Sequence, residues 1–236
     1  MRRLLTPLAL LGCLAQGSWA QTACSSDGQA AAKTLVERFI SADCERCWGQ
    51  GEAAPADPLA LTLDWIVPSA RGDEAALSAA ALRDAQARLD ALARPAPTTS
   101  AVHTSAVLNH PAYRLRVAHG TPVGLYVGAV IELSTSLKVK PSEPLSAWLL
   151  LVETVQAGSD GTPVARNLVR NVLVLTWVEP DQQPQSGEYF FRELRPLSLP
   201  ANARTERLRL VGWLQDAQGR LLTAVQSVCV ESAEVD

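Results

Sequence analysis

The sequence predicts an α/β segment followed by an all-β segment that folds as an antiparallel β-sandwich-like part. Up to Arg94, two short strand-like runs precede one run with helical spacing. Beyond Val102, strand-like runs and turn signals alternate, with no comparable helical stripe. With 47% hydrophobic residues, a chain of 236 residues can bury a substantial core.

The expected α/β segment contains strands at residues 34–42 and 60–67, both rich in aliphatic and aromatic residues. A helix is expected over residues 73–93, where acidic residues occupy the first turn and Arg94-Pro95 is a stop signal. Apolar side chains recur at helical spacing along this stretch: Leu77, Ala81, Leu82, Ala85, Leu89 and Leu92. The proline-rich residues 93–100 then form a loop or a linker.

Seven strand-like runs make up the expected β-rich segment, and turn signals such as Gly120-Thr121-Pro122 separate them. The last two runs are expected to form a hairpin whose second strand carries Cys229. The seven runs are residues 113–119, 125–134, 145–155, 168–178, 188–194, 207–216 and 220–230.

The first 20 residues have the pattern of a cleaved secretory signal. Arg2 and Arg3 precede a short apolar core, and a small-x-small ending predicts cleavage after Ala20. An alternative is a lipoprotein processing site, in which Cys13 would carry a lipid anchor. No apolar stretch is long enough to span a membrane. The mature protein is therefore expected to be periplasmic or secreted.

The charge of the chain argues against a nucleic-acid partner. The formal net charge is -3, and removal of Arg2 and Arg3 with the signal would shift it to -5. Nucleic-acid binding needs a clustered basic face, whereas the arginines here are scattered. No cofactor motif is present, so no cofactor is expected, and an unidentified exported protein is the partner class that remains open.

Four cysteines would remain after cleavage: Cys24, Cys44, Cys47 and Cys229. An even number in an exported protein favours disulfides, although four cysteines allow three pairings. Because Cys44 and Cys47 are local partners, Cys24 is expected to pair with Cys229. Closing so long a loop would stabilise the fold by about 4 to 5 kcal/mol in the chain-entropy model. The alternative is two free buried thiols.

The motif Cys44-Glu45-Arg46-Cys47 directly follows the first strand, which is a thioredoxin-type arrangement. It could be a stable disulfide, a metal clip, or an exchange pair in which Cys44 attacks and Cys47 resolves. A metal site would need two further ligands, and His103 is the histidine best placed to approach. No metal is expected.

The chain resembles the secreted thioredoxin-like bacterial family known as domain of unknown function 1223. Residues 35–41 are similar to the family's first strand, Cys44 and Cys47 fall on its two cysteines, and residues 103–109 resemble a later strand. Asp64-Trp65 and the closing Cys229 also have counterparts. The resemblance implies a degenerate thioredoxin-like part at residues 21–112 and a β-rich domain at residues 113–236.

Two departures from the family pattern bear on activity. Residues 48–51 read Trp-Gly-Gln-Gly where the family has Pro-Pro, so the helix after the motif is expected to be shortened or lost. Without its dipole, Cys44 should behave as an ordinary thiol of pKa about 8.5. Ser105 aligns with the cis-proline that docks substrate peptides. These losses favour a non-catalytic module braced by disulfides over a periplasmic thiol-disulfide oxidoreductase.

Trp48, Asp64 and Trp65 are candidates for a face that contacts a partner or substrate. Trp48 would shield the disulfide, and Asp64 would accept a proton near the cysteines. In the alternative interpretation both tryptophans pack in the core, and Asp64 caps the turn into Pro68-Ser69.

Overall fold

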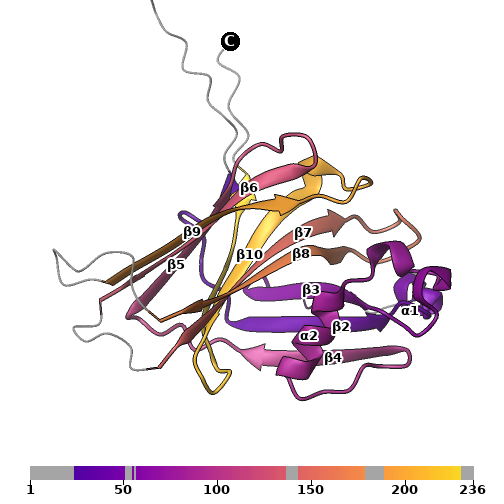
Figure 1. Ribbon diagram of the computed structural model, residues 1–236, viewed down its shortest axis with the longest axis horizontal. Coiled ribbons are helices and arrows are strands. Elements are labelled where there is room, and N and C mark those ends of the chain that lie inside the picture. The colour runs from indigo at the N-terminus through magenta and orange to yellow at the C-terminus, as the bar shows by residue number, and fades with distance from the viewer. Residues whose placement is uncertain (1–23, 51–54, 56, 137–142, 179–188, 230–236) are drawn as a thin grey trace, which may run out of the picture.

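Two β-sheets form the described part of the protein (Figure 1). The computed structural model describes residues 24–50, 55, 57–136, 143–178 and 189–229, so the expected signal and Cys13 lie outside the described residues. The smaller sheet has the strand order β12 (Val228–Cys229), β1 (Cys24–Ser25), β5 (Tyr113–His119), β6 (Tyr126–Thr135) and β9 (Tyr189–Ser198). The larger sheet has the order β11 (Leu221–Gln226), β10 (Leu208–Gln215), β7 (Leu145–Val155), β8 (Arg166–Trp177), β3 (Ala60–Val67), β2 (Thr34–Ser41) and β4 (Ser100–Ala106).

The strands expected from the sequence are present, most of them within one or two residues of the expected ends. The final hairpin of β10 and β11 is confirmed, but Cys229 does not lie on its second strand. The chain leaves the larger sheet at Ser227, whose N–H donates to the Leu210 carbonyl, and continues as β12 in the smaller sheet. Strand β1 was not expected.

The larger sheet contains strands from both segments that the sequence distinguishes. β2 and β3 are parallel, β4 is antiparallel to β2 on its far side, and β3 pairs with β8 in parallel at Asp64 and Leu168. Residues on either side of position 112 therefore contribute to one continuous sheet.

The described residues form three apolar clusters, a small one around Trp48 and Ile66 and two larger cores. The two larger cores lie on opposite faces of the larger sheet, because successive strand residues point to opposite sides. One core joins the two sheets, and its fully buried members include Val117, Ile131, Leu149, Leu151 and Leu210. The other lies beneath helix α2 (Arg83–Ala91), which crosses the larger sheet in Figure 1, and includes Phe39, Trp65, Leu89 and Trp213.

The helix expected over residues 73–93 is correct only in its second half. α2 begins at Arg83, and the preceding stretch forms two 3-10 turns, Gly72–Glu74 and Ser78–Ala80; a third such turn is Thr205–Arg207. The Leu77 N–H donates to the Ala42 carbonyl and the Leu82 N–H to the Ile66 carbonyl. These bonds tie the backbone to the strand ends, so it cannot continue a regular helix there.

The two sheets approach closely at Gly212 in β10. A Cβ atom there would lie 2.6 Å from Val117 Cγ1 of the smaller sheet. We therefore expect Gly212→Ala to lower the free energy of unfolding by about 1–3 kcal/mol, measured by urea denaturation. Gly128→Ala is the matched control, because it is a strand glycine with no atom within 4 Å of the added Cβ. Equal stability of the two variants would contradict the close approach.

Candidate functional site

A disulfide joins Cys44 and Cys47 just beyond the end of β2. The chain turns after Ser41, whose carbonyl accepts a hydrogen bond from the Cys44 N–H at 2.9 Å. Cys44 is the N-cap of helix α1 (Glu45–Gly49) and is only 9% exposed, whereas Cys47 is partly exposed. Cys47 is thus the more accessible member of the pair, although the sequence led us to expect Cys44 as the attacking thiol.

Helix α1 is only five residues long, which confirms the expected shortening. Gly49 ends it, and no side chain caps its first turn. A single turn aligns few peptide dipoles, so it provides little positive potential at Cys44. The exposed Glu45 carboxylate adds negative charge next to Cys44.

A groove of about 830 Å³ opens beside the disulfide, along the face of β2 and β4 that α2 does not cover. Apolar lining comes from Val36, Ile40 and the exposed Val102, and both cysteines of the motif contribute to the wall. Among the described residues, the charged lining consists of Arg38, Arg46, Arg166 and Asp57. The described lining is therefore partly apolar and contains more positive than negative side chains.

Beneath the groove, Asp64 lies fully buried in the middle of β3. Its Oδ2 accepts hydrogen bonds from Arg38 Nη2 and from the Asn167 N–H, both at 2.7 Å, and its Oδ1 accepts one from Arg166 Nη1 at 3.1 Å. None of these donors belongs to the turn at Pro68, so the capping interpretation is wrong. Asp64 is therefore a buried acceptor that contacts two guanidinium groups and one backbone N–H.

Arg166 connects this network to α1. Its Nη2 donates to the carbonyls of Cys47 at 3.1 Å and Trp48 at 2.8 Å, and its guanidinium lies 5.2 Å from the Trp48 ring centroid. Burial lowers the pKa of Arg166, while the Asp64 charge opposes that effect. The Cys47 and Trp48 carbonyls of α1 are therefore held by a buried cation.

Trp48, Asp64 and Trp65 do not form an exposed face. Trp48 is 8% exposed, and its indole N–H donates to the Asp160 carbonyl at 2.7 Å. Trp65 is fully buried and stacks on Phe39. The expectation that these three side chains contact a partner is corrected by their burial, and both tryptophans pack in the interior.

Ser105 does not lie opposite the cysteine motif. The register of β4 places it beside Leu35 at the far end of β2, whereas Ser41, close to the motif, donates its N–H to the Thr99 carbonyl. His103 pairs with Glu37 on the face beneath α2, away from the groove. Ser105 therefore does not lie beside the cysteines, as the family resemblance implied, and His103 does not approach them as a metal ligand would.

Neither Arg38 nor Arg166 was expected at this site from the sequence. One signal was available: Glu37-Arg38 interrupts an otherwise apolar strand, and a charged side chain in a buried strand needs a partner. The partner itself could not be read from the sequence, because Arg166 lies 102 positions beyond Asp64.

The second disulfide joins Cys24 and Cys229, as expected, and ties β1 to β12 across 205 positions of sequence. Two disulfides are typical of proteins from an oxidising, exported location. In the described part of the chain, no helix has the length and apolar character that a membrane crossing requires.

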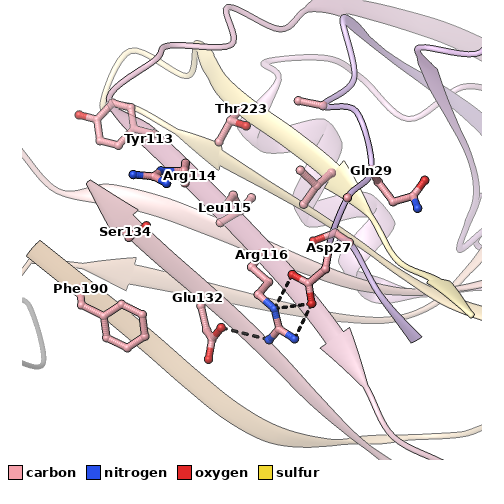
Figure 2. Close-up of a pocket in the computed structure, with 14 residues that line it drawn as sticks. Asp27, Gln29, Tyr113, Arg114, Leu115, Arg116, Glu132, Ser134, Phe190 and Thr223 are labelled. Atoms are coloured by element: carbon pink, nitrogen blue, oxygen red, sulfur yellow. Dashed lines mark hydrogen bonds and ion pairs between the residues drawn. The ribbon is translucent and has the colours of Figure 1, made fainter. Parts of the chain in front are cut away.

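A smaller pocket of about 390 Å³ is lined by residues of β5, β6, β9 and β11 and of the segment that follows β1 (Figure 2). Arg116 lines this pocket; its Nε and Nη2 donate to Asp27, and its Nη1 donates to Glu132 at 3.1 Å. The hydrogen bond from Arg116 lowers the pKa of the exposed Asp27. Because these charges satisfy one another, the pocket offers no free charged group of this triad to a ligand.

Comparison of the chain with protein-family models, curated proteins and solved structures gives no match. The fold and the site thus define the chain as a β-rich protein of two sheets with two disulfides, one of which borders a groove.

Proposed function

We propose that the chain is an exported, thioredoxin-like module, a divergent relative of the domain of unknown function 1223, in which Cys44–Cys47 is a bracing disulfide and not a catalytic centre. In this proposal residues 1–20 are a secretory signal cleaved after Ala20. Both disulfides then form in the oxidising compartment that the mature protein reaches.

The arrangement around the motif supports the thioredoxin-like part of the proposal. β2 leads through the CxxC helix α1 to the parallel strand β3, and the third strand, β4, lies antiparallel on the other side of β2. A cysteine pair at the start of a helix that follows the first strand of such a unit is typical of thioredoxin-like folds.

The short length of α1 is the main observation in favour of a non-catalytic role. An exchange-active first cysteine needs a stabilised thiolate, which a helix N-terminus or nearby positive charge normally provides. α1 has one turn, Glu45 opposes a thiolate at Cys44, and the buried Arg166 donates to Asp64 and to main-chain carbonyls. Cys44 is also nearly buried.

Thiol-disulfide exchange is a second candidate function, which the groove favours. The disulfide borders a cavity large enough for several side chains, and three arginines line the same cavity. Positive charge near a cysteine lowers its pKa in principle.

A dithiol-dependent reductase assay with an unfolded, disulfide-containing substrate distinguishes the two functions. For the bracing role we expect wild-type turnover no greater than that of Cys44→Ser, and both at the uncatalysed rate. A thioredoxin of known activity is the positive control. Turnover well above background that Cys44→Ser abolishes would overturn the bracing role in favour of exchange with Cys44 as an essential thiol.

A further inference from the structure

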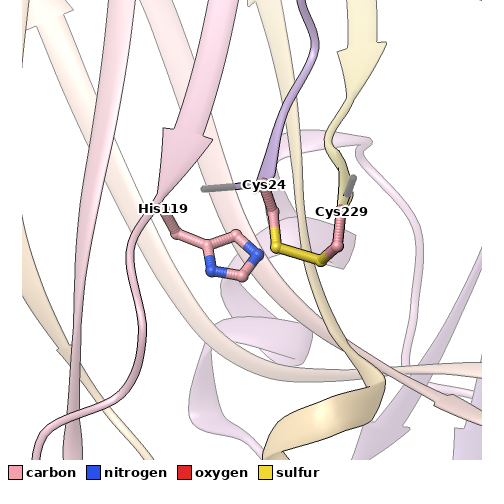
Figure 3. A group of neighbouring side chains, drawn as sticks. All are labelled: Cys24, His119 and Cys229. Carbon is pink, nitrogen blue, oxygen red and sulfur yellow. A yellow bond between two sulfur atoms is a disulfide. The ribbon is translucent and has the colours of Figure 1, made fainter. Parts of the chain in front are cut away.

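Three potential metal ligands lie in one row across the smaller sheet (Figure 3). Cys24 of β1 pairs with Cys229 of β12 on one side and with His119 of β5 on the other. Directly paired residues of adjacent strands project to the same face of a sheet. The two sulfurs and a ring nitrogen accordingly lie within 4.8 Å of one another, and in the described residues no other group of three such side chains is gathered so closely.

His119 already has the orientation and tautomer that a metal ligand needs. It is 6% exposed, and its Nδ1 lies 3.0 Å from the Gly120 carbonyl, which can only accept a hydrogen bond, so Nδ1 carries the proton. Nε2 then holds a lone pair, and it has no hydrogen-bond partner among the described residues. In Figure 3 the ring directs a nitrogen toward the Cys24 sulfur.

Burial lowers the pKa of His119, against the opposing effect of the carbonyls of Gly120 and Leu208. A carbonyl that fixes the Nδ1 proton is also the usual support for a histidine that ligates through Nε2.

We propose that the reduced form of this site binds Zn²⁺ through the thiolates of Cys24 and Cys229 and Nε2 of His119. A dithiol or glutathione-class reductant supplies two electrons: the sulfur–sulfur bond breaks, two thiols form, and the reductant becomes a disulfide. Binding of Zn²⁺ then releases two protons, one from each thiol. The newly made chain has the same two thiols before its disulfide forms.

The geometry suits a tetrahedral ion. Zinc–sulfur bonds of about 2.3 Å at a tetrahedral angle place two thiolate sulfurs roughly 3.8 Å apart. The zinc–nitrogen bond is about 2.0–2.1 Å long. The sulfurs must move apart from their bonded positions, and Cys229 can turn because it lies at the surface. The same exposure admits water as a fourth ligand. The inference does not depend on the role of Cys44–Cys47.

The test uses the full-length chain with Cys13, Cys44 and Cys47 replaced by serine, so that Cys24 and Cys229 are the only thiols. After reduction with a phosphine, Zn²⁺ is titrated in competition with a chromophoric chelator, and Co²⁺ reports thiolate ligation through its charge-transfer absorption. We expect one Zn²⁺ per reduced chain and none per oxidised chain. His119→Ala should weaken Zn²⁺ binding at least about tenfold, since loss of even an outer-shell partner costs about 10–100-fold.

His110→Ala is the matched control, because His110 lies in the loop before β5, outside the row, and its loss should leave Zn²⁺ binding unchanged. Near-UV circular dichroism of the zinc-loaded protein shows whether the fold is retained. Absence of stoichiometric binding, equal binding by the His119→Ala variant, or binding by an unfolded chain alone would each overturn the proposal.

Discussion

Replacing Asp64 by asparagine is expected to lower the free energy of unfolding by about 3–5 kcal/mol. The carboxylate is fully buried and accepts hydrogen bonds from the side chains of Arg38 and Arg166. Asparagine retains the shape of the side chain but removes the negative charge. The Arg166 guanidinium, whose side chain is only 1% exposed, would then lose the buried negative charge that it contacts, and burial of a charge without its counter-ion is costly. Equilibrium urea unfolding of the two proteins measures the difference.

Asp73→Asn is the control for this measurement, because Asp73 is exposed in the turn Gly72–Glu74. A surface change of this kind is expected to alter stability by no more than about 0.5 kcal/mol. If Asp64→Asn were as mild as Asp73→Asn, Asp64 would not be the counter-ion of the two arginines, and the description of the network would be wrong.

Replacing Arg88 by methionine should have an effect of similar size, about 3–5 kcal/mol. Arg88 reaches from α2 to the fully buried Glu37, with hydrogen bonds of 2.8 Å from Nε and 2.7 Å from Nη2. Its guanidinium also lies over the stacked rings of Trp148 and Trp213. Methionine fills much of the same volume but leaves the Glu37 carboxylate unpaired. Urea unfolding again gives the magnitude.

Two further variants test whether loss of the Arg88–Glu37 ion pair causes the loss of stability. Arg83→Met, an exposed change in the same helix, should be nearly neutral. The double variant Arg88→Met/Glu37→Met should recover most of the lost stability, because a buried ion pair can often be replaced by apolar side chains of similar size. A double variant that is less stable than Arg88→Met alone would contradict this account.

Local patterns in the sequence predicted much of the sheet structure. Polar and apolar residues alternate along 113–119, whereas 145–155 is a nearly continuous apolar run, and clear turn signals flank both. The strands β5 and β7 have these bounds. The disulfide pairing also followed from the positions of four cysteines. β4 was less evident, because its residues SAVHTSA are small and polar and it lies at the edge of the larger sheet.

Contacts between residues far apart in the sequence could not be predicted from local sequence patterns. The parallel contact of β3 with β8 joins residues 104 positions apart, since Asp64 pairs with Leu168. The charged pair of Glu37 and Arg88 spans 51 positions, and nothing in the helical periodicity of residues 73–93 shows that Arg88 points inward. The row of Cys24, His119 and Cys229 likewise depends on the register of three strands. Such contacts are properties of the assembled sheet.

The bracing role of Cys44–Cys47 is tested most directly by incubating the native protein in a glutathione buffer poised at about −250 mV and alkylating the free thiols. Mass spectrometry then counts the alkylated cysteines, and near-UV circular dichroism reports the fold. Our account predicts that Cys44 and Cys47 stay unmodified as long as the protein is folded. Complete, reversible reduction of this pair in the folded protein would contradict it and would favour thiol-disulfide exchange.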